Sequence, residues 1–205
     1  MEIKSVSFFG CSCGEKGDSH FDGAYETARA VAKSGRRVVN GGGPGVMLAA
    51  TLGAEEAGGK TTAVYYKPEL ATLFEGKSEI ATNSTDEAYE EANYVMRTKK
   101  LLELGDAYII FNGGTGTVSE FAMAWGLARL YFDHHKPLLL YDDFWQHFIN
   151  DFKEHMLIRP EELEVITIVN SPTEALAAID KYEKVLKKNR HDHIGCKNPE
   201  CLLLL

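Results

Sequence analysis

The sequence lacks the long apolar segments that mark membrane and secreted proteins. No run approaches the roughly 18 consecutive apolar residues that a membrane span requires, and the N-terminal MEIKSVSFFG has neither the apolar core nor the small-residue cleavage site of a signal peptide. The four cysteines form two close pairs, Cys11/Cys13 and Cys196/Cys201, which is unlike the spread of a disulfide framework. We therefore expect a cytoplasmic protein with no membrane partner.

An excess of positive charge is absent as well. The formal net charge of −8 argues against broad attraction to nucleic acid or to an anionic membrane. It leaves room for a local basic site that binds a small anion. The 205 residues, 44% of them hydrophobic and 25% charged, suit one globular domain with a substantial core.

What the sequence does contain is a regular alternation of apolar, β-branched runs with amphipathic segments. We expect strands at residues 3–9, 37–40, 61–66, 78–82, 107–111, 137–141 and 165–169. We expect helices at residues 20–34, 45–58, 86–104, 117–132, 144–155 and 173–188. Continuous apolar strands separated by helices predict a single α/β domain over residues 1–188, with a doubly wound parallel sheet covered on both faces.

Three glycine-rich segments follow predicted strands: GCSCG at 10–14, NGGGPGVM at 40–47 and FNGGTGTVSE at 111–120. The carboxyl ends of parallel strands share one edge, where ligands bind in such sheets. Each segment leaves backbone N–H groups free at a helix start, where the helix dipole favours an anion. The sequence therefore predicts a ligand that carries phosphate.

Other interpretations of these segments fit less well. GGTGTVSE has no lysine after its glycines, as a P-loop would, and Ser119 stands where the dinucleotide fingerprint has its third glycine. GCSCG matches the nucleophile elbow of serine hydrolases formally. However, it ends the first strand of the chain, and that elbow needs an earlier strand and loop for its oxyanion hole. We expect Ser12 to offer its hydroxyl to a ligand instead.

A basic segment lies on the predicted helix 86–104, which begins with a capping-box pattern. At about 100° per residue an apolar stripe runs along this helix. The stripe consists of Ala88, Ala92, Val95 and Leu102. Lys99 falls within the stripe, Arg97 falls on roughly the opposite side, and Lys100 is about a third of a turn away. We therefore expect Lys99 to face the phosphate-binding edge.

The segments MRTKK (96–100) and GDAYIIFNGGTGTVSE (105–120) resemble the LOG family, named for the plant LONELY GUY cytokinin-activating enzymes and often labelled lysine decarboxylase. Family members carry a PGGxGTxxE motif with a Met-His-x-Arg-Lys segment upstream, and the resemblance spans residues 1–170. It implies a Rossmann-like domain that needs no cofactor and forms a homodimer. The implied activity cleaves the N-glycosidic bond of a nucleoside 5′-monophosphate such as AMP, releasing the base and ribose 5-phosphate.

The resemblance also implies site residues. Glu120 would be the catalytic carboxylate at the ribose, aided by the cations of Lys99 and Arg97. Lys99 aligns with the family arginine, Arg97 with its histidine and Lys100 with its lysine. The expected substrate-binding residues are Ser12, Gly41, Gly42, Gly43, Met96, Lys100, Gly113, Gly114, Thr115, Gly116 and Thr117.

Two alternatives follow from the same residues. Lysine cannot form the bidentate fork of arginine, so Lys99 leaves open a protein that binds a nucleotide or another phosphate-bearing ligand without cleaving it, like the molybdenum-cofactor carriers. A pyridoxal-phosphate decarboxylase finds no support, because neither a Schiff-base lysine nor an acidic partner for the cofactor can be identified.

The last segment, residues 189–205, differs in composition from the rest and is expected to be loosely ordered. It contains His191, His193, Cys196 and Cys201, but the spacing of its cysteines is atypical for zinc, so no metal site is predicted.

Overall fold

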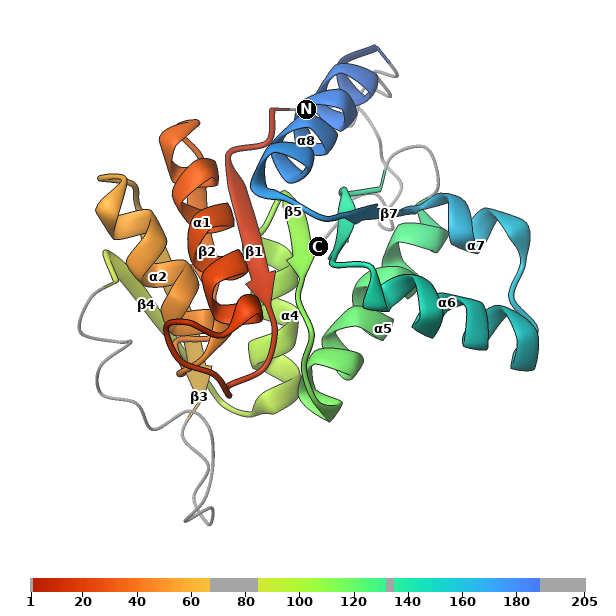
Figure 1. Ribbon diagram of the computed structural model, residues 1–205, viewed down its shortest axis with the longest axis horizontal. Coiled ribbons are helices and arrows are strands. Elements are labelled where there is room, and N and C mark those ends of the chain that lie inside the picture. Colours follow the sequence, from red (N-terminus) through yellow and green to blue (C-terminus); the bar gives the residue numbers. More distant parts are fainter. Residues whose placement is uncertain (1, 67–84, 132–134, 189–205) are drawn as a thin grey trace.

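The computed structural model describes residues 2–66, 85–131 and 135–188. These residues form one α/β domain around a seven-stranded, fully parallel sheet (Figure 1). Its strands are β1 (Ser5–Phe9), β2 (Arg37–Asn40), β3 (Thr61–Tyr66), β4 (Glu87–Glu91), β5 (Ala107–Ile110), β6 (Leu138–Tyr141) and β7 (Ile166–Val169). Its helices are α1 (Ser19–Lys33), α2 (Val46–Glu56), α4 (Tyr94–Leu104), α5 (Thr115–Leu130), α6 (Phe144–His155), α7 (Pro160–Glu164) and α8 (Pro172–Lys188).

The strand order is β4-β3-β2-β1-β5-β6-β7, so the chain runs outward from β1 in one direction and then returns to extend the sheet from β5. The order therefore reverses between β1 and β5, which pair directly from Val6↔Ala107 to Phe9↔Ile110. In open parallel sheets such a reversal opens a crevice at the carboxyl ends of the two strands, where ligands bind.

Helices cover both faces of the sheet, as predicted. One apolar cluster joins α1, α2 and α8 to the face that carries Val6 and Phe8. A second joins α4, α5 and α6 to the opposite face, which carries Phe9. Because successive strand residues point to opposite faces, the apolar run of β1 supplies both cores. This is the doubly wound, Rossmann-like arrangement.

One predicted element is wrong. Residues 86–104 do not form a single helix: Glu87–Glu91 is strand β4, parallel to β3, and α4 begins only at Tyr94. Asn93 caps this helix, its side chain accepting a hydrogen bond from the Met96 amide at 3.0 Å. Glutamate-rich EAYEE favours a helix by propensity, but pairing with β3 and the ion pair of Glu87 with Arg37 override it.

Other differences are smaller. The short helix α7 was not predicted, while the predicted strand 78–82 and the segment 189–205 lie outside the described residues. Among the described residues, no helix combines the length and apolar character needed to cross a membrane.

Candidate functional site

A pocket of about 290 Å³ lies at the carboxyl edge of the sheet, where the strand order reverses. All three glycine-rich segments contribute to its wall, as the sequence predicted. They supply Gly10, Cys11, Ser12, Cys13, Gly41, Gly43, Gly114, Thr115, Gly116 and Thr117. Ligand pockets in proteins have volumes of roughly 300 to 1,000 Å³, so this one suits a small molecule.

The three segments are fastened together through Cys11. Its amide donates to the Asn112 carbonyl at 3.0 Å, and its carbonyl accepts from the Val46 amide at 2.9 Å. Glycine is required on either side: a Cβ on Gly45 would lie 2.4 Å from the Cys11 oxygen, and one on Gly113 would lie 2.8 Å from the Cys11 nitrogen. The pocket wall is therefore one interlocked unit drawn from three distant parts of the chain.

The first turn of α5 faces the pocket. Gly114 is its N-cap, and no side chain caps this helix start in the part of the chain that the structure describes. Thr115, Gly116 and Thr117 follow and line the pocket. Uncapped N–H groups at the positive end of a helix dipole form an anion-binding site.

In the same pocket, Arg97 of α4 and Glu120, on the next turn of α5, form a buried ion pair. The Arg97 Nη1 atom donates to the Glu120 Oε1 atom at 3.1 Å, and their side chains are only 13% and 7% exposed. Arg97 is held further by bonds from Nε to the Val64 carbonyl at 3.1 Å and from Nη2 to the Gly41 carbonyl at 3.4 Å. The planar guanidinium thus fixes the carboxylate against the pocket.

Gly41 makes room for that guanidinium. A Cβ at this position would lie 1.7 Å from the Arg97 Nη2 atom and 2.7 Å from the Met47 sulfur. Glycine here serves close approach to an arginine, in addition to lining the pocket.

Three tyrosines complete the wall: Tyr65 and Tyr66 at the end of β3, and Tyr94 at the start of α4. The Tyr94 hydroxyl bonds to the Gly116 carbonyl at 3.1 Å and to the Ser119 hydroxyl. The Tyr66 and Tyr94 rings meet edge to face with centroids 6.2 Å apart. Tyr94 therefore ties α4 to the first turn of α5 and adds an aromatic surface beside it.

The predicted orientation of the basic segment is wrong. Lys99 does not face the pocket: its side chain is 45% exposed and its Nζ atom pairs with Glu103 at 3.3 Å. Lys100 pairs with Glu103 at 3.6 Å and lies over the ring of Tyr89. Arg97, expected on the far side, lines the pocket instead.

The cause is the misassigned helix start. The stripe that set the helical phase began with Ala88, which belongs to β4, and Ala92, which precedes the N-cap. Val95, another member of the stripe, is 62% exposed, whereas α4 buries Thr98, Leu101 and Leu102. Shifting the phase to these residues turns Arg97 inward and Lys99 outward.

Three further predicted residues are not part of the pocket wall. Met96 is 41% exposed and lies outside the pocket wall, while Gly42 and Gly113 shape the loops without lining the pocket. Gly42 has φ 69° and donates its amide to the Asn40 side chain at 2.8 Å.

Sequence reasoning also missed residues. Tyr65 and Tyr66 end a predicted strand at the same edge as the glycine-rich segments, and this position could have identified them as pocket residues. Tyr94 was hidden inside the misassigned helix. No disulfide was expected, yet the structure joins Cys11 to Cys13.

Comparison with known proteins agrees with this geometry. Residues 47–179 match the model of a family described as "Possible lysine decarboxylase". A cytokinin riboside 5′-monophosphate phosphoribohydrolase of Mycobacterium tuberculosis is 29% identical over 162 residues, which cover 76% of this chain and 82% of the relative. One of Rhodococcoides fascians is 32% identical over 143 residues, covering 68% of each chain.

Solved structures share the fold. The molybdenum cofactor binding protein of Rippkaea orientalis superposes with a TM-score of 0.63 at 23% identity, covering 88% of this chain and 98% of the other. The molybdenum cofactor carrier protein of Chlamydomonas reinhardtii gives a TM-score of 0.64 at 19% identity, with the same coverage. At these identities the likeness concerns the fold alone.

Proposed function

Since the chain belongs to the LOG family, the one described as possible lysine decarboxylase, we propose that it hydrolyses the N-glycosidic bond of a nucleoside 5′-monophosphate. The products are the free base and ribose 5-phosphate. The observation that carries the proposal is the buried Arg97–Glu120 pair, which lies in the same pocket as the uncapped first turn of α5.

The phosphate binds at the first turn of α5. The N–H groups after Gly114 and the hydroxyls of Thr115 and Thr117 are donors suited to a phosphate, and the helix dipole adds to their attraction. Ser12 lines the same pocket and offers a further hydroxyl. A phosphate held here brings the attached ribose close to Glu120, one turn further along α5.

Glu120 acts on the ribose. Cleavage of an N-glycosidic bond passes through an oxocarbenium-like state at C1′, which a carboxylate stabilises. Water adds its hydroxyl to C1′, the C1′–N bond breaks, and the proton goes to the departing base. Arg97 holds the carboxylate in place through the 3.1 Å bond. The base stacks in the aromatic region formed by Tyr65, Tyr66 and Tyr94.

We infer that Arg97, and not Lys99, is the counterpart of the family arginine. Its bonds to Glu120, Val64 and Gly41 use the guanidinium fork that a lysine lacks. The apparent loss of that arginine was the reason to consider binding without cleavage. With Arg97 in the pocket, hydrolysis is favoured over the carrier function.

We also propose a homodimer formed through the outer surfaces of α4 and α5. Four large apolar side chains are exposed there: Val95 at 62%, Met96 at 41%, Met123 at 37% and Leu130 at 73%. The inner face of α5, which includes Phe121, Ala124 and Trp125, is instead buried in the core. Light scattering after size exclusion tests this, and Leu130→Glu is expected to shift the mass toward a monomer.

A cytoplasmic location stays a prediction from the sequence.

A panel of nucleoside 5′-monophosphates, with free base detected by chromatography, tests the proposed reaction. Glu120→Gln is expected to abolish base release while retaining nucleotide binding, since an amide keeps the shape but loses the charge. Glu103→Gln, a change on the exposed side of α4, serves as the control and retains activity. If the protein binds nucleotides but releases no base from any of the nucleotides tested, the carrier function is favoured and hydrolysis is rejected.

A further inference from the structure

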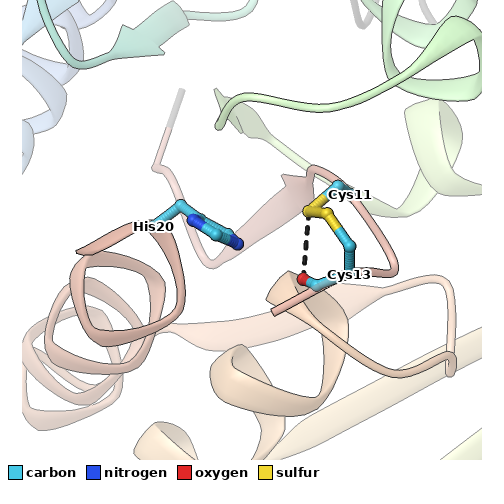
Figure 2. A group of neighbouring side chains, drawn as sticks. All are labelled: Cys11, Cys13 and His20. Carbon is cyan, nitrogen blue, oxygen red and sulfur yellow. Dashed lines mark hydrogen bonds between the residues drawn. A yellow bond between two sulfur atoms is a disulfide. The ribbon is translucent and has the colours of Figure 1, made fainter. Parts of the chain in front are cut away.

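A second group of chemically reactive side chains lies beside the pocket. Cys11, Cys13 and His20 each offer one ligand atom, and these three atoms lie within 4.8 Å of one another. Figure 2 shows the imidazole of His20, on the first turn of α1, directed toward the two cysteine sulfur atoms. The His20 Nε2 atom is buried and has no hydrogen-bond partner among the described residues. A buried imidazole nitrogen without a partner beside two cysteines indicates a missing ligand.

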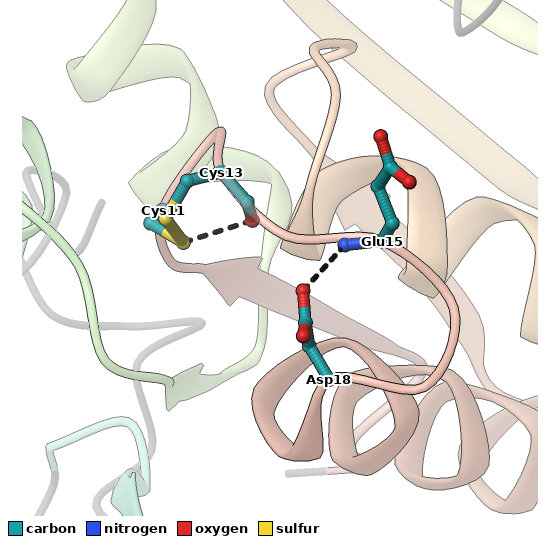
Figure 3. Close-up of a disulfide and its surroundings, with 4 residues drawn as sticks. All are labelled: Cys11, Cys13, Glu15 and Asp18. Atoms are coloured by element: carbon teal, nitrogen blue, oxygen red, sulfur yellow. Dashed lines mark hydrogen bonds between the residues drawn. A yellow bond between two sulfur atoms is a disulfide. The ribbon is translucent and has the colours of Figure 1, made fainter.

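Two carboxylate side chains hold closed the loop between the cysteine turn and His20. The loop between them is closed by a 2.9 Å bond from the Glu15 amide to the Asp18 carboxylate, drawn in Figure 3, and by a 3.0 Å bond from the Gly17 amide to Asp22. A Cβ on Gly14 would lie 2.2 Å from the His20 Nε2 atom, so glycine is needed for the ring to come this close. Gly14 also has φ 96°, a conformation that favours glycine.

In the structure the two cysteines are joined as a disulfide, the oxidised form of the cluster. We propose that the reduced form binds one zinc ion through Cys11, Cys13 and His20. A dithiol reductant supplies two electrons and two protons, is itself oxidised to a disulfide, and leaves two thiols. Zinc then displaces the two thiol protons and is bound by two thiolates and a neutral imidazole.

The geometry and the charge suit zinc. Zinc binds sulfur at about 2.3 Å and imidazole nitrogen at about 2.0 Å in a tetrahedron. The three ligand atoms lie within 4.8 Å of one another, so they are near enough to share an ion once the disulfide is reduced and its two sulfur atoms move apart. Two thiolates neutralise the charge of the ion. Three protein ligands leave the fourth position to water.

Zinc at this position acts on the nucleotide pocket. Cys11 and Cys13 line the pocket, and the backbone of Cys11 is hydrogen-bonded to Asn112 of one glycine-rich segment and to Val46 of another. A shift of Cys11 between the disulfide and the zinc-bound form moves both loops. Nucleotide affinity is therefore expected to differ between the two forms. This consequence rests on the proposed function, whereas zinc binding itself does not.

The test is a metal titration of the full chain without nucleotide. The reduced protein is expected to bind one equivalent of Co²⁺ with a thiolate-to-cobalt charge-transfer band, and Zn²⁺ is expected to displace the cobalt. The oxidised protein is expected to bind neither ion. Because this measurement needs no substrate, a chain without hydrolase activity still gives a clear result.

Matched variants assign the ligands. Cys11→Ser with Cys13→Ser is expected to abolish binding, whereas Cys196→Ser with Cys201→Ser retains it. His20→Ala is expected to weaken zinc binding on the order of 100-fold, since even outer-shell changes cost 10- to 100-fold. His155→Ala, on the exposed end of α6, leaves it unchanged.

Either of two results of the titrations overturns the proposal. One is a reduced protein whose thiols all react with a thiol reagent but which takes up no zinc. The other is binding that is lost with Cys196 and Cys201 instead. If the Cys11/Cys13 variant fails to fold, the unchanged protein is alkylated with and without zinc. Zinc is expected to protect Cys11 and Cys13 from alkylation, and an absence of protection rejects the site.

Discussion

Replacing Arg97 is expected to damage the protein far more than replacing Lys99. The Arg97 side chain is 13% exposed and pairs with a carboxylate that is 7% exposed. Removing one partner of a buried ion pair costs about 3 to 5 kcal/mol, because the other charge is left buried and unpaired. Arg97→Ala also removes the donors that the Val64 and Gly41 carbonyls accept from.

Lys99 provides the matched control on the same helix. Its pair with Glu103 is solvent-exposed, and such pairs contribute about 0 to 1 kcal/mol. Lys99→Ala is therefore expected to change the free energy of unfolding by less than about 1 kcal/mol and to leave base release intact. Lys99→Arg is expected to be equally neutral, because position 99 does not reach the pocket.

The rate of base release is expected to distinguish Arg97 from Lys99 further. Losing a preorganised group that stabilises a transition state costs roughly 10²- to 10³-fold in turnover, and Arg97→Ala is expected to fall in that range. Arg97→Lys keeps the charge without the fork, so its turnover is expected to lie between those of alanine and the original residue. Base release at saturating nucleotide and urea unfolding measure both effects. A larger loss for Lys99→Ala than for Arg97→Ala would refute the assignment of the pocket cation.

Three more outcomes are expected. AMP should bind far more tightly than adenosine by calorimetry, because the first turn of α5 recognises phosphate; equal affinities would remove the phosphate site. Gly41→Ala should lower turnover by displacing the Arg97 guanidinium, whereas Gly126→Ala, with open space around it on α5, should keep activity and add about 0.5 to 1 kcal/mol of stability. Burial lowers the pKa of Lys136 from 10.5 to about 8. Between these values the unfolded chain binds more protons than the folded one, so stability should rise from pH 8 to 10.5 by an amount of order 3 kcal/mol. Lys136→Met should abolish that rise in urea unfolding, and an identical pH dependence in both proteins would contradict it.

The sequence was sufficient to predict the architecture of the site. Apolar runs and glycine-rich turns can be recognised locally in the sequence. Because the carboxyl ends of parallel strands lie at one edge of the sheet, turns that follow different strands are expected to lie close together. The segments at 10–14, 40–47 and 111–120 do meet around one pocket. Glu120 ends the third segment and lines the same pocket, but its proposed role came from the resemblance to the LOG family and not from this argument.

Which of the side chains Arg97 and Lys99 faces the pocket could not be predicted from the sequence, because it depends on the residue at which helix α4 begins. EAYEE has helical propensity and becomes a strand only by pairing with β3, a contact that no local pattern reveals. Once the start was placed too early, the helical phase followed from the wrong residues and turned Lys99 inward. The cysteine cluster was missed for a similar reason: His20 and Cys13 are separated by a loop whose closure depends on hydrogen bonds that backbone amides donate to the carboxylates of Asp18 and Asp22.

Strand β4, which was predicted as part of a helix, has a further consequence for the protein in solution. In the part of the chain that the structure describes, β4 pairs only with β3 and so ends the sheet. A sheet edge exposes unpaired backbone groups that invite the edge of another molecule and lead to aggregation. Three of the five residues in EAYEE are glutamates, and Glu87 and Glu90 are exposed. A second copy aligned on this edge would bring like charges together, so the glutamates oppose intermolecular strand pairing.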